Sequence, residues 1–196
     1  MTEIERDLLK QGYKIICGVD EAGRGSLVGA VFAAAVILPN DTPIKGIDDS
    51  KKLSAETRQR LYDEIINIAL AYSIASADNN EIDEVNILNA TYLAMNRAIE
   101  GLKIKPDISL IDGNRNSGIK HTNKCIIGGD GKSISIAAAS ILAKVSRDRY
   151  IMELAKDYPQ YSFEKHKGYG TKLHYEKLRE FGASDIHRVT FLKKVH

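Results

Sequence analysis

Four carboxylate residues stand where predicted strands end, and they are the residues best suited to chemistry. Asp20 and Glu21 follow the apolar run KIICGV, Asp112 follows ISLI, and Asp130 follows CIIGG. An acid next to glycine is common in tight turns, so a structural role explains each position taken alone. Three such strand ends in one chain favour a functional cluster. If the three strands are neighbours in one sheet, their carboxyl ends bring the four carboxylates into one crevice.

A cluster of this kind needs a cation, because its negative charges repel one another. An all-oxygen ligand set without cysteine or paired histidine is typical of Mg²⁺ or Mn²⁺. Mg²⁺ retains several waters and takes substrate phosphate oxygens as further ligands. Two ions about 4 Å apart would activate an attacking water and stabilise the leaving oxygen of a phosphodiester. The acids therefore predict metal-dependent phosphoryl transfer.

Residues near the acids favour a nucleic-acid substrate. Arg24 lies between Gly23 and Gly25, where the backbone can approach a ligand closely and offer N–H donors beside a guanidinium. Tyr169, flanked by glycines in a basic stretch, can stack on a sugar or base, and Lys51 in DDSKKLS can contact phosphate. A plain turn around Arg24 and a tyrosine folded onto the core are the alternatives that the residues leave open.

The elements that must position these residues alternate between strand and helix. Apolar runs predict strands over 14–19, 28–38, 71–77, 108–111 and 124–127. Ser54 is the expected N-cap of a helix over 54–70, and further helices are predicted over 88–102, 133–156 and 171–182. Strands with interspersed helices predict one α/β unit with a helical tail.

Composition excludes several classes of protein. With 196 residues, 43% of them hydrophobic and 28% charged, the chain has the make-up of one globular domain and not of a disordered protein. An uncharged apolar run of about 18 residues, the length a membrane helix needs, is absent from the sequence, and the N-terminus is acidic where a signal peptide would be basic. We therefore expect a cytoplasmic protein without membrane contact. Cys17 and Cys125 lie in apolar runs, which argues against a disulfide or zinc site.

The net charge of +2 conceals a basic C-terminal quarter. Residues 141–196 hold 12 basic and 7 acidic side chains, and four of the five histidines: His166, His174, His187 and His196. A basic surface there would attract a polyanion, and a solvated helix face is the alternative. The histidines show no metal-ligand spacing, so we expect them to be solvated.

Six motifs occur together in an order and spacing that resemble one family. They are GVDEAGRG (18–25), DDSKKLS (48–54), LIDGN (110–114), GGD (128–130), SIAAASILAKVSRDR (135–149) and HKGYGTKLH (166–174). The chain resembles ribonuclease HII, the type 2 ribonuclease H, over nearly its whole length. The resemblance implies a ribonuclease H-like α/β fold, a mixed β-sheet flanked by helices with a small helical C-terminal appendage. It implies a single catalytic domain over 1–196, with the basic part at about 141–196 packed on it.

The resemblance also implies an activity. Members of the family are endonucleases that hydrolyse the RNA strand of RNA/DNA hybrids and nick on the 5′ side of ribonucleotides embedded in duplex DNA, leaving 3′-hydroxyl and 5′-phosphate ends. The four acids then correspond to the catalytic residues that bind Mg²⁺ or Mn²⁺. Gly23, Arg24 and Gly25 resemble the loop that reads the ribose 2′-hydroxyl, and Tyr169 resembles the tyrosine that stacks on the following sugar.

The sequence departs from the family pattern just after this loop. Ser26 and Ala30 stand where prolines are usual, which bears on the stiffness of the loop. The C-terminal VTFLKKVH shows no clear sliding-clamp peptide, so we expect a monomer with no obligate protein partner. A nuclease of the same superfamily that acts on DNA alone is one rival, and a non-catalytic binder of RNA/DNA hybrids is the other.

Overall fold

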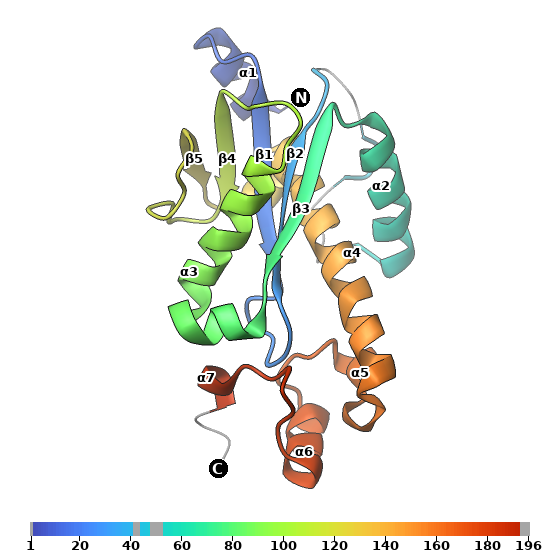
Figure 1. Ribbon diagram of the computed structural model, residues 1–196. Coiled ribbons are helices and arrows are strands. Elements are labelled where there is room, and N and C mark those ends of the chain that lie inside the picture. The colour runs from blue at the N-terminus through green and yellow to red at the C-terminus, as the bar shows by residue number, and fades with distance from the viewer. Residues whose placement is uncertain (1, 41–43, 48–52, 193–196) are drawn as a thin grey trace.

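A mixed five-stranded sheet forms the centre of the protein, as predicted (Figure 1). The structure is a computed structural model that describes residues 2–40, 44–47 and 53–192. The strand order is β3-β2-β1-β4-β5. The strands are β1 (Ile16–Ala22), β2 (Val31–Ile37), β3 (Ala71–Ala77), β4 (Ile108–Asp112) and β5 (Asn123–Ile126). Strands β1, β2 and β3 pair antiparallel, whereas β1, β4 and β5 pair parallel.

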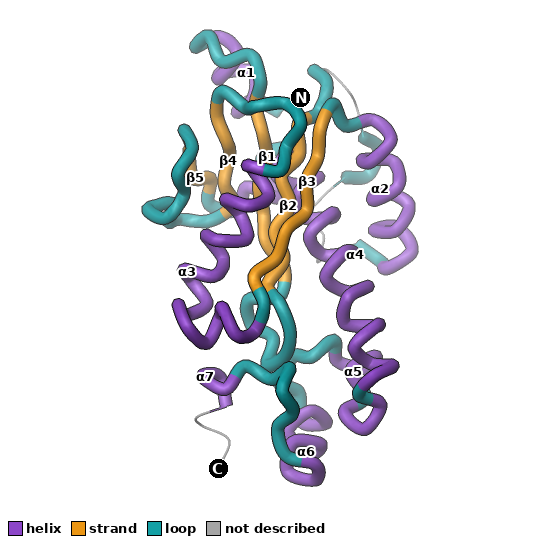
Figure 2. The backbone as a smooth tube through the Cα atoms, in the orientation of Figure 1, coloured by secondary structure: helices purple, strands orange, loops and turns teal. Residues whose placement is uncertain are grey.

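Helices cover both faces of the sheet (Figure 2). Helix α3 packs on one face, and α2 and α4 pack on the other. The helices are α1 (Glu3–Lys10), α2 (Ala55–Ile68), α3 (Asn79–Glu100), α4 (Ile134–Asp157), α5 (Phe163–His166), α6 (Lys172–Phe181) and α7 (Val189–Leu192). Two 3₁₀ turns are η1 (Gly129–Gly131) and η2 (Pro159–Tyr161). In the part of the chain that the structure describes, no helix has the length and apolar character needed to cross a membrane.

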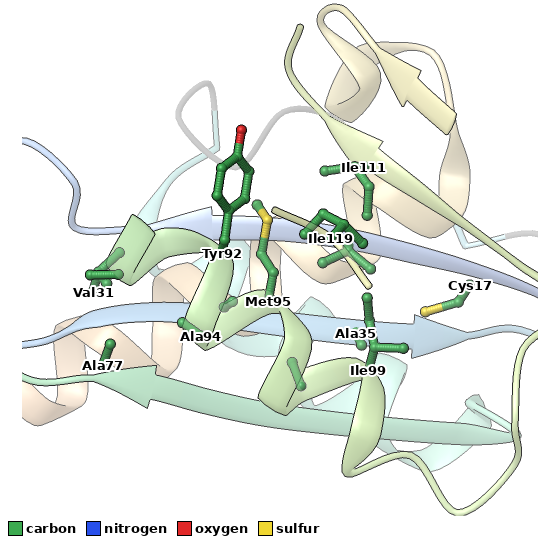
Figure 3. Packing of buried hydrophobic residues seen from close by; sticks show 14 of the residues in the cluster. Cys17, Val31, Ala35, Ala77, Tyr92, Ala94, Met95, Ile99, Ile111 and Ile119 are labelled. Atoms are coloured by element: carbon green, nitrogen blue, oxygen red, sulfur yellow. The ribbon is translucent and has the colours of Figure 1, made fainter. Parts of the chain in front are cut away.

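Strand β2 is buried on both faces, which explains its unbroken apolar sequence. Ala35 faces α3 and packs in one cluster with Met95 and Ile99 (Figure 3). Ala34 and Val36 face the opposite way, into a second cluster made with α2 and α4. Successive side chains on a strand alternate between the two faces, so a strand covered on both sides needs an apolar residue at every position.

Helix α4 lies directly against the backbone of β1. A Cβ atom added to Gly18 would lie 2.0 Å from the carbonyl carbon of Ser135, so this contact requires glycine. The first turn of α4 is fixed by Ser133, whose hydroxyl accepts from the amide of Ile136. The close approach carries the middle of α4 over the carboxyl end of β1.

Two expectations are corrected by the structure. Strand β1 continues to Ala22, which pairs with Phe32 of β2, so Asp20 and Glu21 lie within the strand instead of after its end.

The second correction concerns the histidines, which were expected to be solvated. His166, His174 and His187 are instead buried. Their rings pack around Phe163, and their nitrogen atoms find partners within the C-terminal segment. His196 lies outside the described residues.

Candidate active site

Three of the predicted acids converge at one edge of the sheet. Asp20, Asp112 and Asp130 each offer a carboxylate oxygen, and these oxygens lie within 4.8 Å of one another. Parallel pairing aligns Val19 with Ile111, which places the next residue of each strand side by side. Asp130 reaches the same point from η1, the turn that follows β5. The three acids are thus supplied by three elements far apart in the sequence.

Backbone amides orient two of these carboxylates. The amide of Gly129 donates to Oδ1 of Asp112 at 2.7 Å, and the amide of Glu21 donates to Oδ1 of Asp20 at 2.7 Å. Hydrogen bonds from rigid backbone hold a carboxylate in place before any ligand arrives. The cluster is therefore preorganised.

The electrostatics of the cluster favour a divalent cation. Asp20 is only 4% exposed, and burial raises the pKa of its carboxyl well above the ordinary value. The charges of Glu21 and Asp112 raise this pKa further, while hydrogen bonds from the Glu21 amide and the Ser140 side chain lower it. A hard cation relieves this repulsion, and three carboxylate oxygens are the donors that Mg²⁺ and Mn²⁺ prefer. The residues present therefore fit such an ion.

The fourth acid, Glu21, lies beside this group of three. Because consecutive residues of a strand point to opposite faces, Glu21 and Asp20 leave β1 in opposite directions. Oε1 of Glu21 accepts from Nη1 of Arg24 at 3.2 Å. Glu21 nevertheless lines the same cleft as Asp20 and Asp112.

The cleft of about 590 Å³ over the acids also gathers the predicted substrate-contacting residues. Gly23, Arg24, Gly25 and Tyr169 all line it. A second hollow of about 370 Å³ adjoins it, with Glu21, Arg24 and Asp112 common to both. Lys51 lies outside the described residues.

Sequence reasoning missed three side chains that line this cleft: Arg58, Ser140 and Lys144. Ser140 and Lys144 are one helical turn apart on α4, and Nζ of Lys144 lies 2.8 Å from Oδ1 of Asp148, a further turn along. The recurrence of polar residues at intervals of four, the spacing of one helix face, was the available signal. Cations at the rim of an acidic cleft can bind the phosphates on either side of a metal-bound one.

The site and the fold together define the class of protein. A mixed five-stranded sheet with acids at the adjoining ends of β1 and β4 is a ribonuclease H-like architecture. The crystal structure of ribonuclease H2 from Pyrococcus horikoshii OT3 superposes with a TM-score of 0.76 and 27% identity, covering 93% of this chain and 97% of that one. Ribonuclease HII in its PCNA complex from Archaeoglobus fulgidus superposes with a TM-score of 0.73 and 25% identity, covering 90% and 94%.

Sequence comparison identifies the family within this class. The family model described as Ribonuclease HII matches residues 17–194. A relative named Ribonuclease HII from Caldicellulosiruptor bescii is 58% identical over 193 residues, covering 98% of this chain and 94% of the relative. The chain belongs to the ribonuclease HII family. It is accordingly an endoribonuclease that hydrolyses RNA in RNA/DNA hybrids, and its family depends on divalent metal ions.

Proposed function

We propose that this enzyme also nicks duplex DNA on the 5′ side of single embedded ribonucleotides, in a reaction that requires Mg²⁺ or Mn²⁺ and leaves 3′-hydroxyl and 5′-phosphate ends. One observation carries the proposal: the 4.8 Å carboxylate cluster opens into a cleft walled by the 23–25 loop and Tyr169. A site with acids alone would suit any phosphodiester. The 23–25 loop and Tyr169 add the contacts that would select a ribonucleotide.

The acids have two tasks in this proposal. Asp20, Asp112 and Asp130 hold the metal, and Glu21 adds negative charge at the rim of the same cleft. The metal, when bound, supplies positive charge that stabilises the transition state and lowers the pKa of a water ligand. The hydrogen bonds from the Glu21 and Gly129 amides keep the Asp20 and Asp112 carboxylates turned toward it.

Selectivity for ribose is assigned to the 23–25 loop and Tyr169. The 2′-hydroxyl is the group that distinguishes RNA from DNA, and it needs a hydrogen-bonding partner close to the backbone. Gly23 and Gly25 allow that approach, and Arg24 supplies a cation between them. Tyr169 lines the same cleft, where its ring can stack on the neighbouring sugar.

Basic side chains position the rest of the strand. Arg58 and Lys144 line the cleft and are proposed to contact phosphates that flank the scissile one. The same role is proposed for Lys51. Residues 1–196 would act as one catalytic domain and as a monomer. The PCNA complex of the Archaeoglobus fulgidus enzyme shows that a relative has a partner, whereas we propose no obligate partner for this chain.

The decisive experiment uses a duplex with one ribonucleotide in an otherwise DNA strand. The purified enzyme is incubated with Mg²⁺, with Mn²⁺ or with chelator, and the cut is mapped at nucleotide resolution. We expect one nick on the 5′ side of the ribonucleotide, none with chelator and none in an all-DNA duplex. Cutting of the all-DNA duplex would favour a DNA nuclease. Binding without product at any metal concentration would favour a non-catalytic hybrid binder.

A further inference from the structure

We propose that Ser26 is a positioning residue that holds the 23–25 loop and Tyr169 together as one unit, and that this unit sets the preference of the enzyme for isolated ribonucleotides. The selectivity part rests on the proposed function. The coupling of the two segments does not depend on that function, because it is argued from the contacts of Ser26.

The Ser26 hydroxyl uses its full hydrogen-bonding capacity inside the protein. The residue is fully buried, and its Oγ lies 2.9 Å from the carbonyl oxygen of Val28 and 3.1 Å from that of Gly168. It accepts from Nη2 of Arg147 at 2.8 Å. A hydroxyl has one hydrogen, which is shared between the two carbonyls and so links the loop to the C-terminal segment, and it has lone pairs that accept from Arg147. The Ser26 hydroxyl therefore links the segments through hydrogen bonds as well as through packing.

The backbone around Ser26 joins the same two segments. Ser26 and Tyr169 form an isolated antiparallel bridge, and the amide of Leu27 donates to the Gly168 carbonyl at 2.9 Å. On its other side, the amide of Ser26 donates to the Gly23 carbonyl at 3.2 Å, which closes the turn of the 23–25 loop. Ser26 therefore lies at the junction of the two walls assigned to ribose selection.

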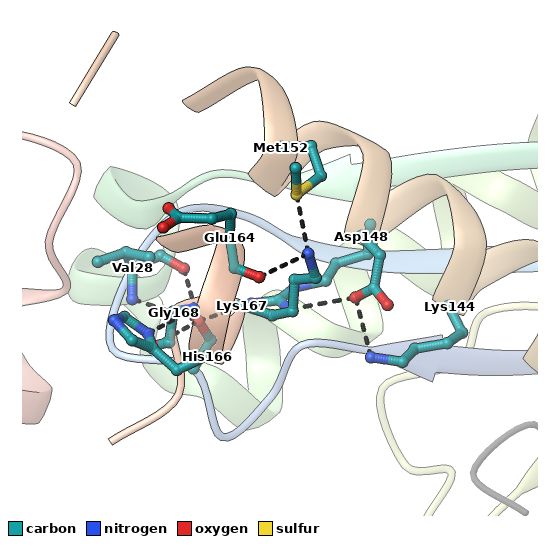
Figure 4. A network of polar contacts seen from close by, with 10 residues as sticks. Val28, Lys144, Asp148, Met152, Glu164, His166, Lys167 and Gly168 are labelled. Carbon is teal, nitrogen blue, oxygen red and sulfur yellow. Dashed lines mark hydrogen bonds and ion pairs between the residues drawn. The ribbon is translucent and has the colours of Figure 1, made fainter. Parts of the chain in front are cut away.

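The two segments are closely packed at this junction. Gly168 has φ +77°, and a Cβ added there would lie 2.5 Å from Val28 Cγ2 and 2.8 Å from Ser26 Oγ. Val28, His166 and Gly168 lie close together in the contact network of this region (Figure 4). Because the segments touch through backbone and a short hydroxyl, a displacement of one is passed to the other.

Arg147 extends the unit to the Tyr169 ring. Its guanidinium is buried and lies 4.8 Å from the ring centroid, where a cation attracts the aromatic face. Nη1 of Arg147 lies 3.4 Å from Oδ1 of Asp148. Loss of the Ser26 hydroxyl would leave an Arg147 N–H without that acceptor in a buried site, which is costly. The side-chain part of the link between the ring and the loop would then be lost, and only the backbone contacts would join the two segments.

Proline at this position would act differently from serine. It would stiffen the loop but would remove both the hydroxyl and the amide that donates to Gly23. Ser26→Ala removes only the hydroxyl, and Ser26→Cys keeps a side chain of similar volume with weak hydrogen bonding. Comparison of the alanine and cysteine variants therefore separates the loss of hydrogen bonding from the loss of packing.

The first test is hydrogen–deuterium exchange of the free enzyme, which needs no substrate. In Ser26→Ala we expect amides in both 23–29 and 167–170 to exchange at least about fivefold faster, since one lost buried hydrogen bond changes local opening by that order. The strands of the sheet should keep their protection. Unchanged protection in either segment would overturn the coupling. If the alanine variant does not fold, Ser26→Cys is measured with the same expectation.

The second test is the ratio of kcat/KM on a single-ribonucleotide duplex to kcat/KM on a continuous hybrid. We expect Ser26→Ala and Ser26→Cys to lower this ratio by about fivefold to tenfold, in line with the loss of one buried hydrogen bond. A ratio equal to that of the wild type, in variants that fold, would overturn the selectivity role. A wild-type enzyme that does not cut the single-ribonucleotide duplex would instead refute the proposed function, and the exchange experiment would still decide the coupling.

Discussion

Nη1 of Arg188 donates a hydrogen bond to the backbone carbonyl of Arg24 at 2.9 Å, joining two residues 164 positions apart in the chain. Nε of Arg188 donates to the Gly29 carbonyl at 2.9 Å. The side chain is fully buried, and burial, helped by the charge of Arg147, lowers its pKa to about 10. Arg188 thus holds the backbone at two points, Arg24 within the 23–25 loop and Gly29 just after it.

Replacing Arg188 should therefore weaken the whole protein. Arg188→Met keeps much of the apolar stem but removes two charge-assisted hydrogen bonds to carbonyls, and we expect the free energy of unfolding to fall by about 2–4 kcal/mol. Urea denaturation measures this. Arg179→Met, at an exposed position of α6, is the matched control and should change stability by less than about 0.5 kcal/mol. Equal stability of the two variants would contradict the role of Arg188.

Two of the buried histidines, His187 and His174, form a hydrogen-bonded relay that ends at the backbone of Tyr169. The amide of Ser184 donates to Nδ1 of His187 at 3.0 Å, so the proton of that ring is on Nε2, facing Nε2 of His174 at 3.3 Å. His174 then carries its proton on Nδ1, which donates to the Tyr169 carbonyl at 3.0 Å. This assignment requires both rings to be neutral. Burial, helped by the proximity of a second imidazole, lowers the pKa of each ring to about 4.

This relay predicts a loss of stability in mild acid. Between pH 6.5 and about 4 the unfolded chain binds protons on these rings more readily than the folded protein does, so the free energy of unfolding decreases as the pH falls through this window. We expect a loss on the order of 1 kcal/mol per ring by pH 5. Urea midpoints at pH 7.5, 6 and 5 measure it. His174→Gln should flatten the pH dependence, and an unchanged slope in that variant would count against the relay.

Removal of the Asp20 charge should separate activity from stability. Asp20→Asn is expected to abolish cleavage while raising the metal-free stability by about 1 kcal/mol, because it relieves the repulsion by Glu21 and Asp112 in a buried site. Thermal unfolding measures the metal-free stability and its response to metal: Mg²⁺ should raise the midpoint of the wild type and not that of the variant. Asp157→Asn, at an exposed position, is the control. A metal-dependent midpoint retained in Asp20→Asn would contradict the assignment.

Glu5 anchors α1 to the start of α4. The residue is 3% exposed, and its carboxylate accepts from the Ser133 hydroxyl at 2.6 Å and from the Ser135 amide at 3.3 Å. A negative charge at a helix N-terminus is also favoured by the helix dipole. Glu5→Gln should therefore lower the free energy of unfolding by about 1–2 kcal/mol and leave kcat on a continuous hybrid unchanged. Glu3→Gln, exposed on the same helix, should leave the urea midpoint unchanged, and equal midpoints in both variants would refute the anchor.

Local signals explain how much could be predicted from the sequence. Ser54, Ser133 and Thr171 each cap a helix by accepting from the backbone amide three residues on, and such caps depend on neighbours within one turn. The meeting of Asp20 with Asp112 was predictable for a related reason. Parallel strands end at the same edge of a sheet, so acids near those ends share a crevice wherever the strands are adjacent.

What could not be predicted depends on partners distant in the chain. Arg147, Arg188 and His174 have polar side chains that a hydropathy pattern assigns to the surface, yet all three are fully buried. Their burial is stabilised by acceptors such as the Ser26 hydroxyl, 121 positions from Arg147, and by carbonyls of the same loop. Such acceptors exist only once the C-terminal segment has packed on the end of the sheet.

We propose that Asp20, Asp112 and Asp130 together hold a divalent cation. Crystals grown or soaked in Mn²⁺, measured with anomalous scattering at the manganese edge, test it directly. We expect an anomalous peak within coordination distance of the Asp20 and Asp112 carboxylates, and we expect it to be lost in crystals of Asp20→Asn. A map with no peak at these carboxylates under saturating Mn²⁺, or with the peak unchanged in the variant, would contradict it.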